Sequence, residues 1–264
     1  MMPSVFFQHY VPQRPLAEFV AFFWYWRGHA VAGSPERILP MATVELVINL
    51  GDGHKANAGI SGPQSKSFIL ESASQRELLG IHFKPGGAFP FLGSPCGELL
   101  NLNLTLADLW GERKAAELLA RVHEAATVAE KFQSLEHWLI LNATRPLRRH
   151  PAVSYALQEF QRDPGLLKSE ILAESIGISQ RRFIQLFRDE MGLAPKLFGR
   201  LQRFQQVIQA IASRDTVDWR ELALACGYFD QAHFIHEFKE FSSLTPGEYL
   251  GLRTAHPRHV RLPA

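Results

Sequence analysis

The spacing of apolar residues divides the chain into two regions. In residues 1–90, aromatic and β-branched residues form short runs such as ERILPMATVELVINLG (36–51) and RELLGIHFKPGG (76–87), between stretches rich in glycine and proline. Such runs, bounded by turn residues, predict a small antiparallel β unit. From about residue 105 the apolar residues recur at helical spacing. We therefore predict an α+β chain with a β-rich, cupin-like N-terminal domain and an all-α C-terminal domain.

Two helices are expected to close the N-terminal domain. Thr105 to Asp108 and Thr127 to Glu130 each combine a capping side chain with an acid in the first turn, which predicts helices at about 107–123 and 128–142. Apolar Phe132, Leu135 and Leu139 on the second helix suit either the core or a dimer contact. The proline-bounded segment ATRPLRRHP (143–151) is predicted as a linker. The predicted domains are residues 1–142 and 152–252, with a basic tail at 253–264.

The C-terminal domain contains an internal repeat. The recurring positions are Leu172, Ala173 and Gly177 with Leu222, Ala223 and Gly227, and Phe183, Phe187, Pro195 and Phe198 with Phe234, Phe238, Pro246 and Tyr249. The first set is offset by 50 residues and the second by 51, so the second copy has one extra residue in the turn after its glycine. Each copy reads as a helix, a tight turn and a helix with aromatic residues at i and i+4. This order predicts two helix-turn-helix units.

The segments LAESIGISQRRFIQLFRDEMGLAP (172–195) and ELALACGYFDQAHFIHEFKEFSSLTPGEYL (221–250) resemble the AraC/XylS family of bacterial transcription regulators. The resemblance implies two helix-turn-helix units on a connecting helix, here Lys196 to about Ala212. Each unit would place one helix in successive major grooves of double-stranded DNA. WYWRG near residue 24, LPMATVELVINLG and GIHFKPGGAFPFLGSP also resemble the N-terminal domain of one subgroup. That domain implies a sensor for a small-molecule effector or a homodimer contact, and an activator would also contact RNA polymerase.

Matching this sequence to the family, position by position, implies ten DNA-contacting residues. They are Gln180, Arg181, Arg182, Ile184 and Gln185 in the first recognition helix, and Gln231, Ala232, His233, Ile235 and His236 in the second. Arginine can bind guanine and glutamine can bind adenine with two hydrogen bonds, while isoleucine suits a thymine methyl group. The family often has arginine where this chain has Gln185 and His236. We also expect Asp230 to cap the second recognition helix.

Charge distinguishes the two units. The whole chain has a net charge of +2, and this value by itself gives no information about a nucleic-acid partner. Residues 179–203 have six basic and two acidic residues, or +4, whereas 230–254 have two basic and four acidic residues, or −2. Phosphate contacts supply much of the affinity of a protein for DNA. The first unit is therefore expected to anchor the complex and the second to tune it.

Other residues leave alternatives open. Trp24, Trp26, Glu45 and His82 in the β-rich domain either line an effector pocket or belong to the core. The pair His233-x-x-His236 could also bind zinc, although zinc helices more typically place two histidines four residues apart. We predict no metal, no cofactor and no catalytic residue.

Several classes of protein are disfavoured. The N-terminus lacks the pattern of a signal peptide, and the apolar run FVAFFWYW is too short to span a bilayer, so no membrane partner is expected. The two cysteines, Cys96 and Cys226, do not form a CxxC motif and fit a reducing cytoplasm. The alternative function is a DNA-binding unit fused to a small metal-dependent or repair-type enzyme domain. A repair enzyme of the Ada type needs four zinc-binding cysteines.

Overall fold

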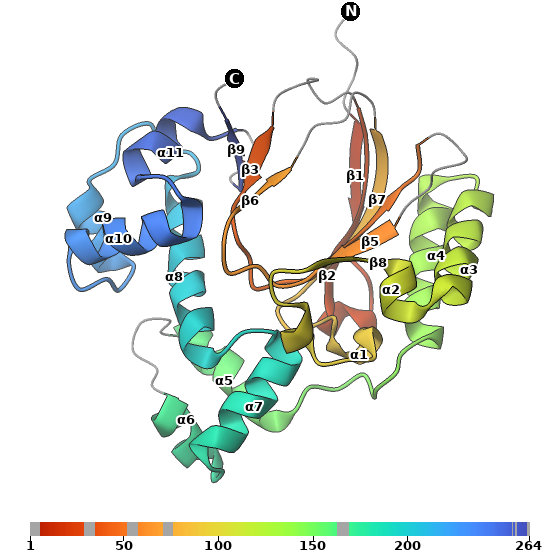
Figure 1. Cartoon of the computed structure of the whole chain (residues 1–264), viewed down its shortest axis with the longest axis horizontal. Helices are drawn as coiled ribbons and strands as arrows, with labels where there is room; N and C mark the ends of the chain where they lie inside the picture. The colour runs from red at the N-terminus through yellow and green to blue at the C-terminus, as the bar shows by residue number, and fades with distance from the viewer. Residues whose placement is uncertain are drawn as a thin grey trace, which may run out of the picture.

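A computed structural model describes residues 6–28, 35–51, 58–70, 76–162, 169–254, 256 and 258–262. Figure 1 shows a β-rich N-terminal half and a helical C-terminal half, which confirms the predicted α+β class. The strands are β1 (Phe6–Tyr10), β2 (Val20–Gly28), β3 (Glu36–Ile38), β4 (Glu45–Asn49), β5 (Ala58–Ser61), β6 (Phe68–Leu70), β7 (Arg76–Phe83), β8 (Asn103–Thr105) and β9 (His259–Arg261). The α-helices are α1 (Phe89–Leu92), α2 (Leu106–Trp110), α3 (Glu112–Glu124), α4 (Val128–Leu141), α5 (Pro151–Arg162), α6 (Ser169–Ile176), α7 (Gln180–Met191), α8 (Pro195–Ile211), α9 (Trp219–Ala225), α10 (Gln231–Ser242) and α11 (Pro246–Leu252). Two short 3-10 helices are η1 (Leu16–Glu18) and η2 (Cys96–Leu99).

The larger sheet has six antiparallel strands in the order β1-β2-β7-β4-β5-β8. Side chains alternate between its two faces. Phe23 of β2 is fully buried and packs on Phe132 of α4, with ring centroids 6.3 Å apart. Leu135 and Leu139 of α4 are buried in the same core. Phe132, Leu135 and Leu139 of α4 thus belong to the core.

The boundaries of two predicted elements differ in the structure. The predicted helix at 107–123 is divided into α2 and α3 at Gly111, whose φ of 86° is left-handed and ends the first helix. The turn-rich stretch after residue 51 contains β5, which pairs with β4 and β8. Both predicted capping boxes are present, at Thr105 and Thr127.

The C-terminal half holds two helix pairs joined by a long helix. The first pair is α6 and α7, the second is α9 and α10, and α8 runs between them (Figure 1). The prolines Pro195 and Pro246 stand at the first turns of α8 and α11, where a missing backbone N–H has no cost. Aromatic side chains from both pairs lie in one buried cluster. The predicted repeat therefore corresponds to two packed units on one connecting helix.

A second, three-stranded sheet joins the two halves of the chain. Its order is β6-β3-β9, so strands from the N-terminal half pair with a strand from the predicted basic tail. Val260 of β9 is fully buried, and His259 Nδ1 lies 2.7 Å from Glu36 Oε2. The segment after the second helix-turn-helix unit thus completes a sheet of the N-terminal half.

The C-terminal end of α7 also contacts the N-terminal half. Arg149, in the predicted linker, lies over the ring of Phe19 and donates to Glu190 Oε1 of α7 at 3.3 Å. The backbone N–H of His150 donates to the other oxygen of Glu190 at 3.1 Å. The linker is thereby fixed to both halves, while its boundaries at 143 and 151 stay a prediction. No helix among the described residues has the length and apolar character needed to cross a membrane.

Candidate functional site

The two helices that are expected to contact DNA, α7 and α10, begin in closely similar ways. Gly177 and Gly227 adopt φ values of 75° and 77° in the turns before them, a region that glycine enters without steric cost. Ser179 caps α7 by accepting from the backbone N–H of Arg182, and Asp230 caps α10 by accepting from that of His233. The predicted role of Asp230 is confirmed. Both caps leave the first turns of α7 and α10 open to solvent.

Arg181 and Arg182 are exposed on the first turn of α7. Phe183 and Phe187, on the opposite face of this helix, are fully buried. Among the residues that the structure describes, neither guanidinium group has a hydrogen-bond or ion-pair partner. Both cations are therefore free to bind an external acceptor.

The remaining candidates on α7 are already engaged. Gln180 donates from its amide to Glu170 Oε1 at 3.1 Å, and Gln185 donates to Asp189 Oδ1 at 2.7 Å. Ile184 is half-buried against the apolar cluster of the C-terminal half. A base contact by either glutamine amide group would replace one of these internal hydrogen bonds.

The candidates on α10 divide in the same manner. Gln231, Ala232, His233 and His236 are exposed, whereas Ile235 is half-buried against the core. His233 turns toward its own domain: its ring meets that of Tyr228 edge-on at 5.5 Å between centroids. Of the two histidines, His236 is the one whose ring makes no hydrogen bond, ion pair or aromatic contact with the described residues.

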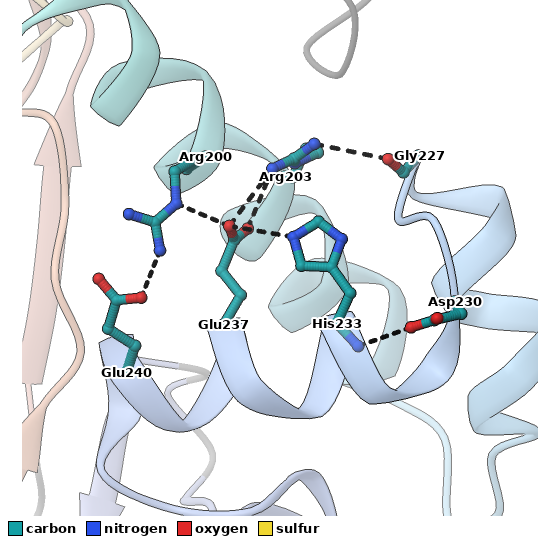
Figure 2. A network of polar contacts seen from close by, with 7 residues as sticks. All are labelled: Arg200, Arg203, Gly227, Asp230, His233, Glu237 and Glu240. Carbon is teal, nitrogen blue, oxygen red and sulfur yellow. Dashed lines mark hydrogen bonds and ion pairs between the residues drawn. The ribbon is translucent and has the colours of Figure 1, made fainter.

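A polar network fixes α10 on α8 (Figure 2). Glu237, whose side chain is 2% exposed, accepts from Arg200 Nε at 2.7 Å and from Arg203 Nη2 at 3.3 Å. Arg200 also pairs with Glu240, and His233 Nε2 lies 3.9 Å from Glu237 Oε2. Helix α10 is thus oriented by charge pairs as well as by apolar packing.

This network changes the distribution of free charge. The two arginines of the network are counted in the net charge of +4 of residues 179–203, and its two glutamates are counted in the −2 of residues 230–254. Because these arginines pair with these glutamates, the four charges neutralise one another. The exposed basic residues that remain in the first window are Arg181, Arg182, Arg188 and Lys196. The first unit therefore retains a basic surface at and beyond α7, and the predicted asymmetry between the units persists.

Three of the four candidates in the β-rich half meet on one face of the larger sheet. Trp24 of β2 donates from Nε1 to Glu45 Oε1 of β4 at 2.5 Å, and His82 Nδ1 of β7 lies 2.5 Å from Glu45 Oε2. The His82 ring also stacks on Phe22 with centroids 4.9 Å apart. Trp26 lies on the same face, further along β2, and no contact joins it to this group. The three residues therefore form a polar cluster, called the Glu45 cluster below, in which each carboxylate oxygen already has a partner.

Residues that follow the helix-turn-helix region approach the Glu45 cluster. Burial lowers the pKa of the Arg258 guanidinium, and the negative charge of Glu45 acts in the opposite direction. The backbone carbonyl of Arg258 accepts from Leu39 N at 2.9 Å, next to β3. A cation from the C-terminal segment is thus held near the carboxylate of the N-terminal sheet.

Gly80 of β7 makes room for Trp24. A Cβ atom at position 80 would lie 2.3 Å from Cε2 of this indole, which is far inside contact distance. We expect Gly80→Ala to displace Trp24, break its hydrogen bond to Glu45 and lower the free energy of unfolding by about 1–3 kcal/mol. Equilibrium urea denaturation with tryptophan fluorescence would measure both effects. As a control, Gly247→Ala should be neutral or slightly stabilising, since a Cβ there meets nothing within 4 Å; equal losses in both variants would contradict this account.

The described residues contain neither a cluster of metal ligands nor a reactive form of the Cys96 thiol. Burial raises the pKa of the Cys96 thiol to about 12, so it is not a thiolate nucleophile at neutral pH. Within the described parts of the chain, no three His, Cys, Asp or Glu side chains gather as metal ligands, and His233-x-x-His236 has no third donor there.

One exposed residue beside α10 is not among the ten candidates that the sequence suggested. Phe229, in the turn before Asp230, is 86% exposed. The signal that could have identified it is the change of offset from 50 to 51 between the two copies, which marks the extra residue in that turn.

Two family models match the chain. Residues 172–251 match a model described as "Helix-turn-helix domain", which spans most of α6 and all of α7 to α10, and nearly all of α11. Residues 8–105 match a model described as "Domain of unknown function (DUF6597)".

Single proteins are also similar to the chain. One is an uncharacterised HTH-type transcriptional regulator of Haemophilus influenzae, 32% identical over 118 residues, which are 44% of this chain and 38% of that protein. The chain thus spans little more than a third of that relative. Among solved structures, the C-terminal domain of AraT, a response regulator from Geobacillus stearothermophilus, is 24% identical, with 40% of this chain and 89% of that one covered, at a TM-score of 0.38. ToxT from Vibrio cholerae is 11% identical, and the match covers 95% of this chain and 97% of ToxT, at a TM-score of 0.44.

Proposed function

We propose that this chain is a transcription regulator of the AraC/XylS type, which its residues 172–251 resemble, and that it binds specific DNA sequences. The observation that carries the proposal is the pair of capped recognition helices, α7 and α10, whose first turns are solvent-exposed while their aromatic faces are buried. Residues in the first turns of such helices contact base edges in the major groove. In this reading α7 and α10 enter successive major grooves.

The first unit is proposed to supply most of the affinity. Arg181 and Arg182 are exposed and unpaired among the described residues, and Arg188 and Lys196 extend the basic surface. Each phosphate contact by such a cation releases counterions and strengthens binding at low salt. Arg181, next to the start of α7, is proposed to bind a guanine with two hydrogen bonds.

The second unit is proposed to contribute sequence preference more than affinity. Its network glutamates pair with α8. Of its exposed polar residues, Gln231 can bind adenine with two hydrogen bonds, and His236 can bind one donor or acceptor on a base. His233 contacts Tyr228 and lies near Glu237. For this reason we propose that it supports the geometry of α10 in addition to any contact with DNA.

The N-terminal half is proposed to sense a small molecule, to mediate dimerisation, or to do both. Support comes from the Glu45 cluster, which unites polar groups of three strands and whose carboxylate acts electrostatically on Arg258 of the C-terminal segment. A ligand that exchanged hydrogen bonds with Glu45 would act on residues of both halves. Contact with RNA polymerase is proposed for the case of an activator.

The test begins with the full-length protein and a pool of random duplex DNA. Repeated selection should enrich one sequence family, and that duplex then serves as the probe in fluorescence anisotropy at fixed salt. We expect Arg181→Ala to weaken binding by about 1–3 kcal/mol, the range for one bidentate base contact. His236→Ala should weaken it less, because the second unit carries less of the phosphate attraction.

The matched control is Arg113→Ala, which removes an exposed arginine from α3 of the N-terminal half. It should leave the affinity unchanged. Failure to enrich any sequence would contradict the proposed function. An effect of Arg113→Ala as large as that of Arg181→Ala would show that binding depends on overall charge and not on the α7 surface.

A further inference from the structure

The two helix-turn-helix units differ by one residue in the turn. In the first, Ile178 donates its backbone N–H to Ala173 O at 3.1 Å, and the cap Ser179 follows at once. In the second, Tyr228 makes the same bond to Ala223 O at 3.0 Å, but Phe229 stands between it and the cap. Phe229 is thus the extra residue of the repeat.

The ring of Phe229 does not belong to either hydrophobic core of the described residues. Its side chain is 86% exposed, more than any other large apolar side chain among the described residues. The neighbouring Tyr228 is 3% exposed and fills the position that Ile178 occupies in the first unit. Burial of a phenylalanine normally contributes to stability. The position of Phe229 therefore forgoes this contribution in the free protein.

The location of the ring indicates what would cover it. Phe229 directly precedes Asp230, the cap of α10, and lies next to the exposed first turn with Gln231 and Ala232. This end of a recognition helix approaches base edges, and the apolar partner that a base edge offers in the major groove is the thymine 5-methyl group. Residues 230–254 also contain only two basic residues, Lys239 and Arg253, with which to contact phosphates. An apolar contact suits this surface better than a charged one.

We propose that Phe229 is a specificity-determining residue that packs its ring against a thymine methyl group at the site read by α10. The inference rests on the proposed function, because it requires α10 to lie in the major groove. It assigns to the second unit a thymine contact made from the turn before α10, and the first unit has no residue equivalent to Phe229 in its turn.

The experiment combines a protein variant with a modified base. The probe is the duplex selected by the full-length protein, and each thymine is replaced in turn by deoxyuridine, which lacks only the 5-methyl group. We expect one replacement to weaken binding of the unmodified protein by about 5- to 30-fold, within the range carried by single base pairs. Phe229→Ala should show a similar loss on the original duplex and no further loss on the modified one.

Leu224→Ala is the matched control, since Leu224 is a 56% exposed apolar side chain on α9 of the same unit. It should bind every duplex as the unmodified protein does. Thermal unfolding of Phe229→Ala should match that of the unmodified protein, because the ring is exposed. Unchanged affinity in Phe229→Ala, or a loss that adds to the deoxyuridine effect at every thymine, would overturn the inference while leaving the selected duplex as support for the proposed function. Selection of no duplex would instead overturn the proposed function.

Discussion

Replacing Glu237 by alanine is expected to lower the free energy of unfolding by about 3–5 kcal/mol. The Glu237 side chain is 2% exposed and is the shared acceptor for Arg200 and Arg203. Arg203 is itself only 10% exposed, so the substitution leaves a buried cation without its counter-charge. Since the same pairs connect α10 to α8, sequence-specific DNA binding should weaken as well. Equilibrium urea denaturation and anisotropy would measure the two effects.

Glu240→Ala provides the matched control. Glu240 also pairs with Arg200, but its side chain is 48% exposed. Exposed ion pairs contribute about 0–1 kcal/mol, so this variant should be nearly as stable as the unmodified protein. A loss in Glu237→Ala no larger than that in Glu240→Ala would mean that Arg203 is hydrated in the folded state, and the network would then have no role in fixing α10.

Replacing Glu190 by alanine should destabilise the junction between the two halves, by about 2–4 kcal/mol. Burial raises the pKa of the Glu190 carboxyl and lowers that of the Arg149 guanidinium, so both charges of this pair are desolvated. Alanine leaves Arg149 unpaired and removes the acceptor of the His150 backbone N–H. Urea denaturation gives the stability, and limited trypsin digestion with mass spectrometry gives the local effect.

In the digestion, cleavage after Arg149 should become faster in Glu190→Ala, while cleavage after the exposed Arg148 should change little. Glu117→Ala is the control for stability, because Glu117 forms a solvent-exposed pair with Arg121 on α3. It should cost at most about 0.5 kcal/mol. If Arg149 is cleaved as fast in the unmodified protein as in Glu190→Ala, the ion pair does not hold the linker in place.

The helical half was largely predictable because its signals are local. The aromatic pairs Phe183/Phe187 and Phe234/Phe238, the turn glycines and the prolines at the first turns of α8 and α11 each specify structure within a few residues. The exposed first turns follow from the same spacing. Which bases these residues contact stays a prediction, since base contacts depend on a partner that the sequence does not contain.

What could not be predicted depends on contacts between distant residues. The Glu45 cluster unites β2, β4 and β7, and only the strand register brings its three side chains together. The Glu237 network joins α10 to α8. Charges that are counted separately for each unit do not show that these arginines and glutamates neutralise one another. β5 was missed because AGIS is short and glycine-containing, and it becomes a strand only through its partners β4 and β8.

The pairing of β9 with β3 has a consequence for biosynthesis. A ribosome makes a chain from its N-terminus, and domains generally fold in that order as they emerge. Strand β3 and its neighbour β6 emerge early, but their sheet lacks β9 until both helix-turn-helix units have been translated. The free edge of β3, with its unpaired backbone groups, is therefore exposed on the nascent chain throughout that interval. The N-terminal half thus reaches its final form only after translation of the helical half, which links the maturation of one to the synthesis of the other.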